Sequence, residues 1–62
     1  MTPEQELRWI FGYVATGDTE NLKNILNCEL VYTEAGMRQF LQLLASRVKS
    51  LTAKIELARK PV

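Results

Sequence analysis

The C-terminal half of the chain carries the apolar pattern that most constrains the fold. From residue 37 to residue 58, apolar residues recur at steps of four and three, a heptad pattern kept for about three repeats. Its members are Met37, Leu41, Leu44, Val48, Leu51, Ile55 and Ala58. Thr33 suits an N-cap, and no proline occurs until Pro61, which is expected to stop the helix after Lys60. The pattern predicts one long amphipathic helix beginning at Glu34.

Two shorter helices are predicted ahead of this long one. Pro3 suits the first position of a helix, where its missing N–H is not needed, and Gly17 suits the left-handed residue that ends one. Asp18 or Thr19 can then cap a second helix through a side-chain oxygen, and that helix fades through residues 27–30. We therefore interpret the acidic stretch that begins at Asp18 as a turn between helices.

The size of the chain limits how it can be stabilised. Its 62 residues leave room for one core, and natural domains of this size commonly add disulfides, a metal or oligomerisation. Cys28 is the single cysteine and there is no histidine, so neither an internal disulfide nor a zinc site is expected. We predict one all-α domain over residues 1–62, a helix hairpin plus a long helix in a small bundle that forms a dimer.

Charge is divided unevenly between the two halves. Residues 1–34 hold two basic and six acidic side chains, whereas residues 35–62 hold six basic and one acidic. This asymmetry predicts that the long helix packs against the two short ones, within one chain or across a dimer. A parallel coiled coil would oppose Lys54 with Arg59, so an antiparallel homodimer is favoured, and a helix of another protein is the alternative.

Two sets of residues are candidates for contact with a partner. The heptad row is the predicted surface for self-association or partner binding, through Met37, Leu41, Leu44, Val48, Leu51 and Ile55. Three aromatic residues, Trp9, Tyr13 and Phe40, are candidate anchors if they are exposed, and core residues if they are not. A helix of about 26 residues reaches roughly 39 Å, and the first helix could cover about half of it.

No catalytic, metal or cofactor site is predicted. Without histidine there is no ordinary serine or cysteine triad, and Ser46 and Ser50 have no evident base. Asp18 and Glu20 are interpreted as capping residues and not as magnesium ligands. The three glycines form no phosphate-binding spacing. These observations favour a non-enzymatic protein without a cofactor.

A basic surface on the long helix supports a different class of function. Five cationic residues could follow a phosphate backbone: Arg47, Lys49, Lys54, Arg59 and Lys60. The near-neutral net charge of +1 and the absence of a recognisable nucleic-acid-binding motif work against this reading. A nucleic-acid-linked transcription modulator therefore stays the alternative, and it requires that the acidic half leave this basic side free.

Two short stretches resemble known families. "TGDTEN" resembles the inhibitory motif of the small antitoxins of Fic adenylyltransferases, which implies that Thr16, Glu20 and Asn21 carry it and that the glutamate obstructs ATP positioning. "DT" opening a short helix, followed by a long helix with "ASRVKSLT", is similar to the Hha/YmoA modulators of nucleoid proteins, which implies a role in transcription. The chain is assigned to neither family.

The cellular setting follows from three further features. No apolar run approaches the roughly 20 residues that span a bilayer, and the acidic start lacks the pattern of a secretory signal. A lone thiol fits a reducing compartment. We therefore expect no membrane partner, a cytoplasmic location, and a small bacterial or phage accessory protein that acts as a regulator, adaptor or inhibitor by binding protein.

Overall fold

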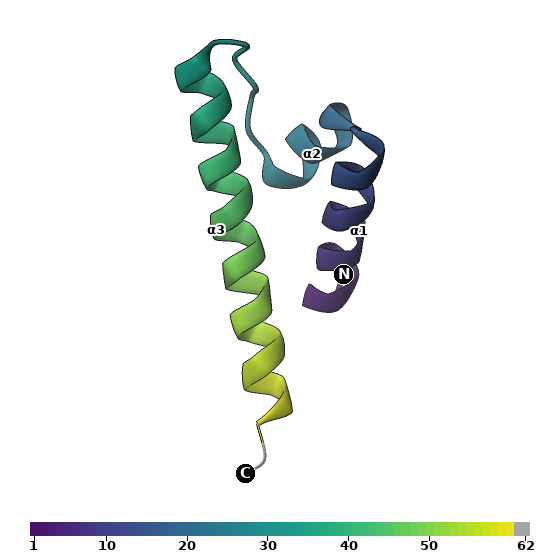
Figure 1. Cartoon of the computed structure of the whole chain (residues 1–62). Coiled ribbons are helices and arrows are strands. Elements are labelled where there is room, and N and C mark those ends of the chain that lie inside the picture. Colours follow the sequence, from purple (N-terminus) through teal and green to yellow (C-terminus); the bar gives the residue numbers. More distant parts are fainter. Residues whose placement is uncertain (61–62) are drawn as a thin grey trace.

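The computed structural model describes residues 1–60 and consists of three helices (Figure 1). They are α1 (Pro3–Thr16), α2 (Thr19–Leu26) and α3 (Glu34–Arg59). Residues 1–60 contain no strand, so the prediction of an all-α fold with two short helices and one long helix is confirmed. The expected helix stop at Pro61 lies outside the described residues.

Local capping fixes both ends of α1. The Thr2 side-chain hydroxyl accepts a hydrogen bond from the Gln5 backbone N–H at 3.2 Å, and the Gln5 side-chain carbonyl accepts one from the Thr2 backbone N–H at 3.1 Å. Gly17 follows the helix with φ 69°, the left-handed conformation that favours glycine. α1 therefore begins and ends where the sequence predicts.

Capping also explains the acidic turn before α2. A carboxylate oxygen of Asp18 accepts a hydrogen bond from the Asn21 backbone N–H at 3.2 Å, so Asp18 and not Thr19 is the N-cap. Thr33 caps α3 in the same way, through a hydrogen bond from the Gly36 backbone N–H at 3.0 Å. The stretch after Gly17 is thus a helix-capping turn, as predicted.

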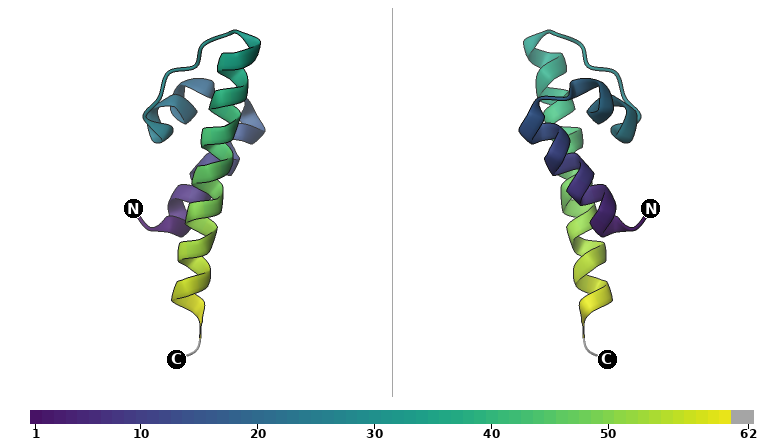
Figure 2. Two further views of the ribbon diagram at one scale, coloured as in Figure 1. Left: turned by 90° about the vertical axis from the view of Figure 1, so that its left-hand side faces the viewer. Right: turned by 90° about the vertical axis from the view of Figure 1, so that its right-hand side faces the viewer.

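The three helices form a hairpin-like bundle of unequal arms. α1 and α3 lie side by side and run in opposite directions, and α2 packs against both near the start of α3 (Figure 1). α3 has 26 residues and α1 has 14, and the side views show α3 extending past α1 at both ends (Figure 2). The molecule is elongated, with principal extents of 46 × 20 × 17 Å. The ends of α3 therefore receive little cover from the rest of the chain.

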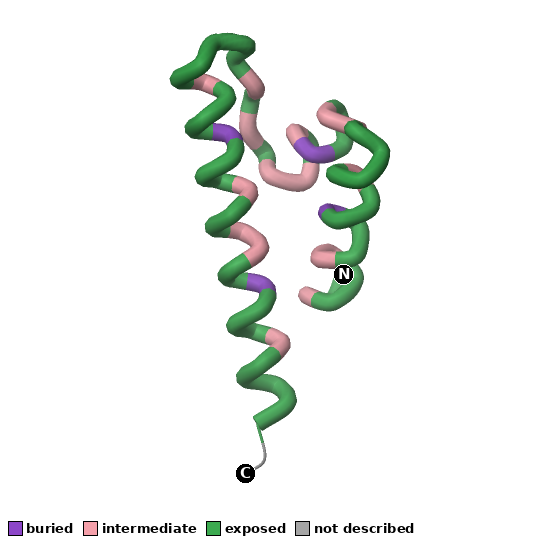
Figure 3. Tube along the Cα trace, viewed as in Figure 1, coloured by how far each residue is buried: buried purple, intermediate pink, exposed green. Residues whose placement is uncertain are grey.

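The core is small and lies where the three helices meet. Among residues 1–60, four side chains are buried, and all four are apolar: Ile10, Leu22, Phe40 and Leu51. Along α3, buried and half-buried positions recur on the side that faces α1 and α2, while both ends are largely exposed (Figure 3). Intrachain packing therefore uses the middle of α3 on one side only.

This contact face is displaced from the predicted heptad row. Phe40 lies outside the row but is buried at 6 % exposure, whereas Met37, Leu41 and Ala58 belong to the row and are exposed. Leu22 of α2 packs into the same core cluster as Phe40, because α2 approaches α3 from the side that carries this ring. The heptad row is therefore divided: its inner part packs within the chain and its outer part faces solvent.

We expect Asp18→Ala to lower the free energy of unfolding by about 1 kcal/mol, because the first turn of α2 loses the acceptor for an N–H group. Thr19→Ala is the matched control and should cost less, since no cap hydrogen bond to its side chain forms at the start of α2. Urea unfolding followed by circular dichroism at equal protein concentration measures both variants. Equal losses would show that the cap is assigned wrongly.

Two glycines provide a second matched pair. Gly12 is exposed within α1 and no described atom lies within 4 Å of an added Cβ, so Gly12→Ala should raise the free energy of unfolding by roughly 0.5–1 kcal/mol. A Cβ at Gly36 would collide with the backbone oxygen of Val31, so Gly36→Ala should lower it by about 1–3 kcal/mol. Thermal unfolding of both variants checks these opposite signs. A stabilised Gly36→Ala variant would contradict the packing of the segment before α3.

Candidate protein-binding face

Exposed apolar side chains gather along one side of the α1–α3 pair. Leu7, Phe11 and Val14 occur at steps of four and three, so they form one row along α1. Phe11 is 54 % exposed and Val14 is 49 % exposed, which is high for apolar residues so close to the core. On α3, Met37 is 50 % exposed and Leu41 is 61 % exposed. Two rows on antiparallel helices therefore present apolar surface to solvent.

A hollow of about 260 Å³ lies at the end of this side nearest α2. Its lining is almost wholly apolar and comes from the end of α1, the start of α2, the segment before α3, and the first half of α3. The apolar residues that line it are Val14, Leu22, Leu30, Met37, Phe40, Leu41 and Leu44. The floor of this hollow is core, and its rim is formed by exposed residues of both rows.

A second, shallower depression continues the same side toward the other end of the pair. Leu7 and Phe11 of α1 line it together with Ile55 of α3, and Glu4, Arg8 and Arg59 border it. Because both depressions follow the same two rows, we treat them as one surface, here called the apolar face. It comprises Leu7, Phe11, Val14, Met37, Leu41, Leu44 and Ile55.

The structure separates the predicted heptad residues into two groups. Leu51 is buried, and Leu44 and Val48 are half-buried against the core. Ile55 is half-buried and opens onto the apolar face. Met37 and Leu41 are the exposed members, as described above. The row is therefore partly a core element and partly a free surface.

The three candidate aromatic anchors also separate. Phe40 is a core residue, so it is not a surface anchor, and Tyr13 is half-buried against the core. Trp9 is 49 % exposed and lies beside Tyr13 and Ile25, in a depression away from the apolar face. Phe11 was not among the candidate anchors predicted from the sequence. Its position four residues after Leu7 nevertheless indicates that both side chains lie in one row along α1.

The basic residues of α3 do not form one surface. Arg47 points inward: its guanidinium lies 3.5 Å from a Glu6 carboxylate oxygen and donates a hydrogen bond to the Ile25 carbonyl oxygen at 3.5 Å. Within residues 1–60, no ion pair involves the exposed side chains of Lys49, Lys54, Arg59 or Lys60. At about 100° per residue, Lys49 and Lys54 lie about 140° apart around the helix. The cations therefore face several directions, which does not favour a continuous phosphate-binding row.

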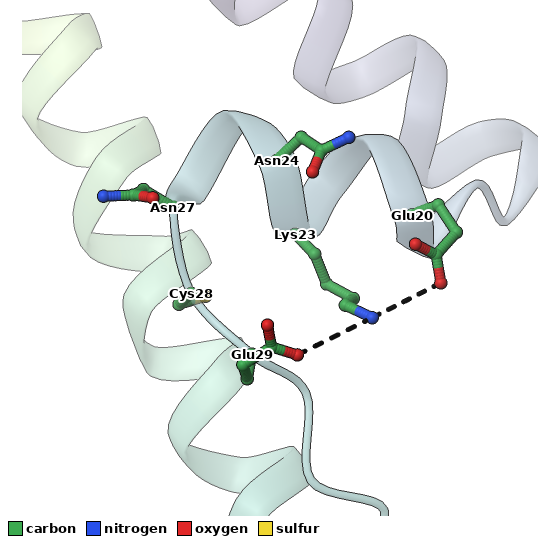
Figure 4. A pocket seen from close by; sticks show the side chains of 6 residues that line it. All are labelled: Glu20, Lys23, Asn24, Asn27, Cys28 and Glu29. Atoms are coloured by element: carbon green, nitrogen blue, oxygen red, sulfur yellow. Dashed lines mark hydrogen bonds and ion pairs between the residues drawn. The ribbon is translucent and has the colours of Figure 1, made fainter.

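A polar depression beside α2 surrounds Lys23 (Figure 4). The Lys23 ammonium donates a hydrogen bond to a Glu20 carboxylate oxygen at 3.3 Å and lies 3.9 Å from a Glu29 carboxylate oxygen. The hydrogen bond and charge of Glu20, with a smaller contribution from Glu29, raise the pKa of Lys23 above its ordinary value. Cys28 is half-buried at the edge of this depression. Nowhere in residues 1–60 do three potential metal ligands gather.

The residues of the Fic-type motif do not share a helix. Thr16 ends α1, whereas Glu20 and Asn21 lie in the first turn of α2, and Gly17 breaks the helix between them. That inhibitory motif belongs on a continuous helix. Glu20 is instead paired with Lys23, and the Asn21 side chain donates a hydrogen bond to Asp18 at 2.6 Å. This geometry speaks against the antitoxin resemblance.

Comparisons with models of known protein families, with curated proteins and with solved structures find no match to this chain. None of the helices in residues 1–60 combines the length and the hydropathy that crossing a membrane requires.

We expect Arg47→Met to lower the free energy of unfolding by about 1–2 kcal/mol, because it leaves the buried carboxylate oxygen of Glu6 without its counter-charge. In a Glu6→Gln background the same substitution should cost about 0.5–1 kcal/mol less. Urea unfolding of the four chains of this double-mutant cycle measures the coupling. Lys49→Met is the control and should change stability by no more than about 0.5 kcal/mol. Additive effects would show that the pair is not coupled.

Proposed function

We propose that this chain is a small non-enzymatic protein-interaction module, and that it acts as a regulator, adaptor or inhibitor by binding an amphipathic helix on its apolar face. The observation that carries the proposal is the apolar lining of the hollow between α1, α2 and α3, bordered by exposed Leu41, Met37 and Val14. Contiguous apolar surface of this kind marks interaction sites in small proteins.

The shape of the apolar face favours a helix as the ligand. Two antiparallel helices with apolar residues at steps of four and three leave a groove between them, and a third apolar row can pack into such a groove. The hollow beside Leu41 and Val14 is large enough for one aliphatic or aromatic side chain. Fully burying a side chain such as Leu41 or Phe11 is worth roughly 1.5–3 kcal/mol, and about half of that is unrealised while each stays half exposed.

A cytoplasmic setting is part of the proposal, because the single unpaired thiol of Cys28 is typical of a reducing compartment. Transcription modulation through nucleic acid receives less support. Arg47 is engaged by Glu6 and Ile25 inside the fold, and the remaining cations are spread around α3. Protein binding is therefore the function that the geometry favours.

Photo-crosslinking from a photo-reactive amino acid at position 41 tests this function in the cells that naturally produce the protein. Leu41 lies on the rim of the hollow, so illumination should join the chain covalently to a protein, whether another protein or a second copy. Ala53 is the control position: it is exposed and lies nine residues, about two and a half turns, from Leu44, on the opposite side of α3. Adducts specific to position 41 support the proposal. Adducts no more abundant than at position 53 would overturn it.

A further inference from the structure

We infer that the ligand of the apolar face is a second copy of this chain, docked antiparallel across a twofold axis that passes α3 near residue 46. This inference rests on the proposed function and names its partner. It follows from the order of apolar and charged residues along α3, from the surface area of the chain, and from the position of α1 beside α3.

The heptad row of α3 reads the same in both directions. Its steps from residue 37 to residue 55 are four, three, four, three and four. A half-turn about an axis at residue 46 therefore brings Met37 opposite Ile55 and places Leu41 of each copy near the middle of the interface, while Leu51 stays in the core of its own chain. An isologous interface requires this kind of self-complementary surface.

The charges beside this row select the antiparallel direction. Charged residues lie at both ends of α3 on or beside the heptad row, Glu34 and Arg38 at one end and Glu56 and Arg59 at the other. Glu34 continues the heptad spacing ahead of Met37, and within the chain it pairs with Arg38. The same half-turn places Glu34 opposite Arg59 of the second copy and Arg38 opposite Glu56. The register that these two charge pairings require agrees with the register of the apolar row to within one or two residues, or about 3 Å along the helix axis. A parallel arrangement would instead oppose Lys54 with Arg59, which are like charges.

Small residues occupy the middle of the same side of α3. Ala45 and Thr52 are exposed and lie between its two charged ends. Short side chains near the twofold axis leave room for a second helix to approach α3 closely. This side of α3 thus has charged residues at its ends and short side chains in its middle. Such a surface suits a helix of similar length that runs in the opposite direction.

The surface area of the chain matches the requirement of a dimer. Its accessible surface is 4924 Å², whereas a compact monomer of 7.1 kDa is expected to expose about 4,100 Å². The excess of roughly 800 Å² equals what each partner buries in an interface of standard size. The radius of gyration of 12.9 Å likewise exceeds the about 10.6 Å expected for 62 compactly folded residues.

The position of α1 completes the fit. α1 covers the second half of α3, where Leu7 and Phe11 lie beside Ile55, and it leaves Met37 exposed in the first half. The half-turn carries Met37 of one copy onto Ile55 of the other, next to the exposed ring of Phe11. Each copy then supplies the cover that the other lacks, and α1 and α3 of both copies form a four-helix arrangement.

Sedimentation equilibrium of the full chain over a concentration series tests the inference. The native chain should form a dimer, and Leu41→Lys should weaken the dimer by at least about a hundredfold, because a charge enters the apolar interface. Ser50→Lys should leave the dimer unchanged, because Ser50 is exposed and lies nine residues, about two and a half turns, from Leu41, on the opposite side of α3. Circular dichroism of the Leu41→Lys chain at low concentration should still show a folded helical protein, which separates lost association from lost folding.

A charge exchange tests the direction and register. Arg59→Glu should weaken the dimer about fivefold at low salt, since two pairs across the axis become repulsive. The double variant Glu34→Lys with Arg59→Glu should restore association to within about twofold, because the antiparallel register again pairs opposite charges. Failure of the double variant to recover, or a parallel dimer, would overturn the inference.

The same experiments distinguish the inference from the proposed function. A monomer at every concentration, combined with position-41 adducts of another protein, would overturn self-association and leave protein binding in place. A monomer without such adducts would overturn both. Adducts of twice the chain mass at position 41, together with the charge-exchange result, would support both.

Discussion

The difference in length between α3 and α1 is the constraint on which the rest of the structure depends. At 1.5 Å per residue, the 26 residues of α3 extend about 39 Å and the 14 residues of α1 about 21 Å. α2 and the segment before α3 cover part of the difference but not the side of α3 that carries Met37 and Leu41. The apolar row of α3 is therefore covered in the middle, and Met37 and Leu41 face solvent.

The ion pair between Glu6 and Arg47 connects α1 with α3. It is the one ion pair in residues 1–60 that joins α3 to another helix, and Arg47 also reaches the Ile25 carbonyl. One side chain of α3 thus contacts both α1 and α2. Within residues 1–60, the uneven distribution of charge in the sequence thus leads to one ion pair between α1 and α3.

The sequence predicted what depends on neighbouring residues and missed what depends on distant ones. Pro3, Gly17 and Thr33 predicted helix ends correctly, and the cap of α2 was narrowed to Asp18 or Thr19, since caps are satisfied within a few residues. The heptad spacing predicted which residues of α3 are apolar on one side, but it could not show that Phe40 would replace Met37 in the core. That outcome depends on where α2 packs, which the periodicity of α3 alone does not encode. Phe11 was missed for a related reason, since it shares helical spacing with core residues of α1 and only the opening between the helices leaves it exposed.

A core of four buried side chains among residues 1–60 leaves little margin of stability. Domains of this size bury a smaller fraction of their surface than larger domains do and are only marginally stable alone. A partner that binds only the folded state stabilises it in proportion to the logarithm of its concentration relative to the dissociation constant. If that partner is a second copy, stability rises with the concentration of the chain itself, and a dilute chain is both less associated and less folded. The exposed half of the heptad row would then be needed for the fold as well as for recognition, which explains why residues with no intrachain partner continue the spacing of the core.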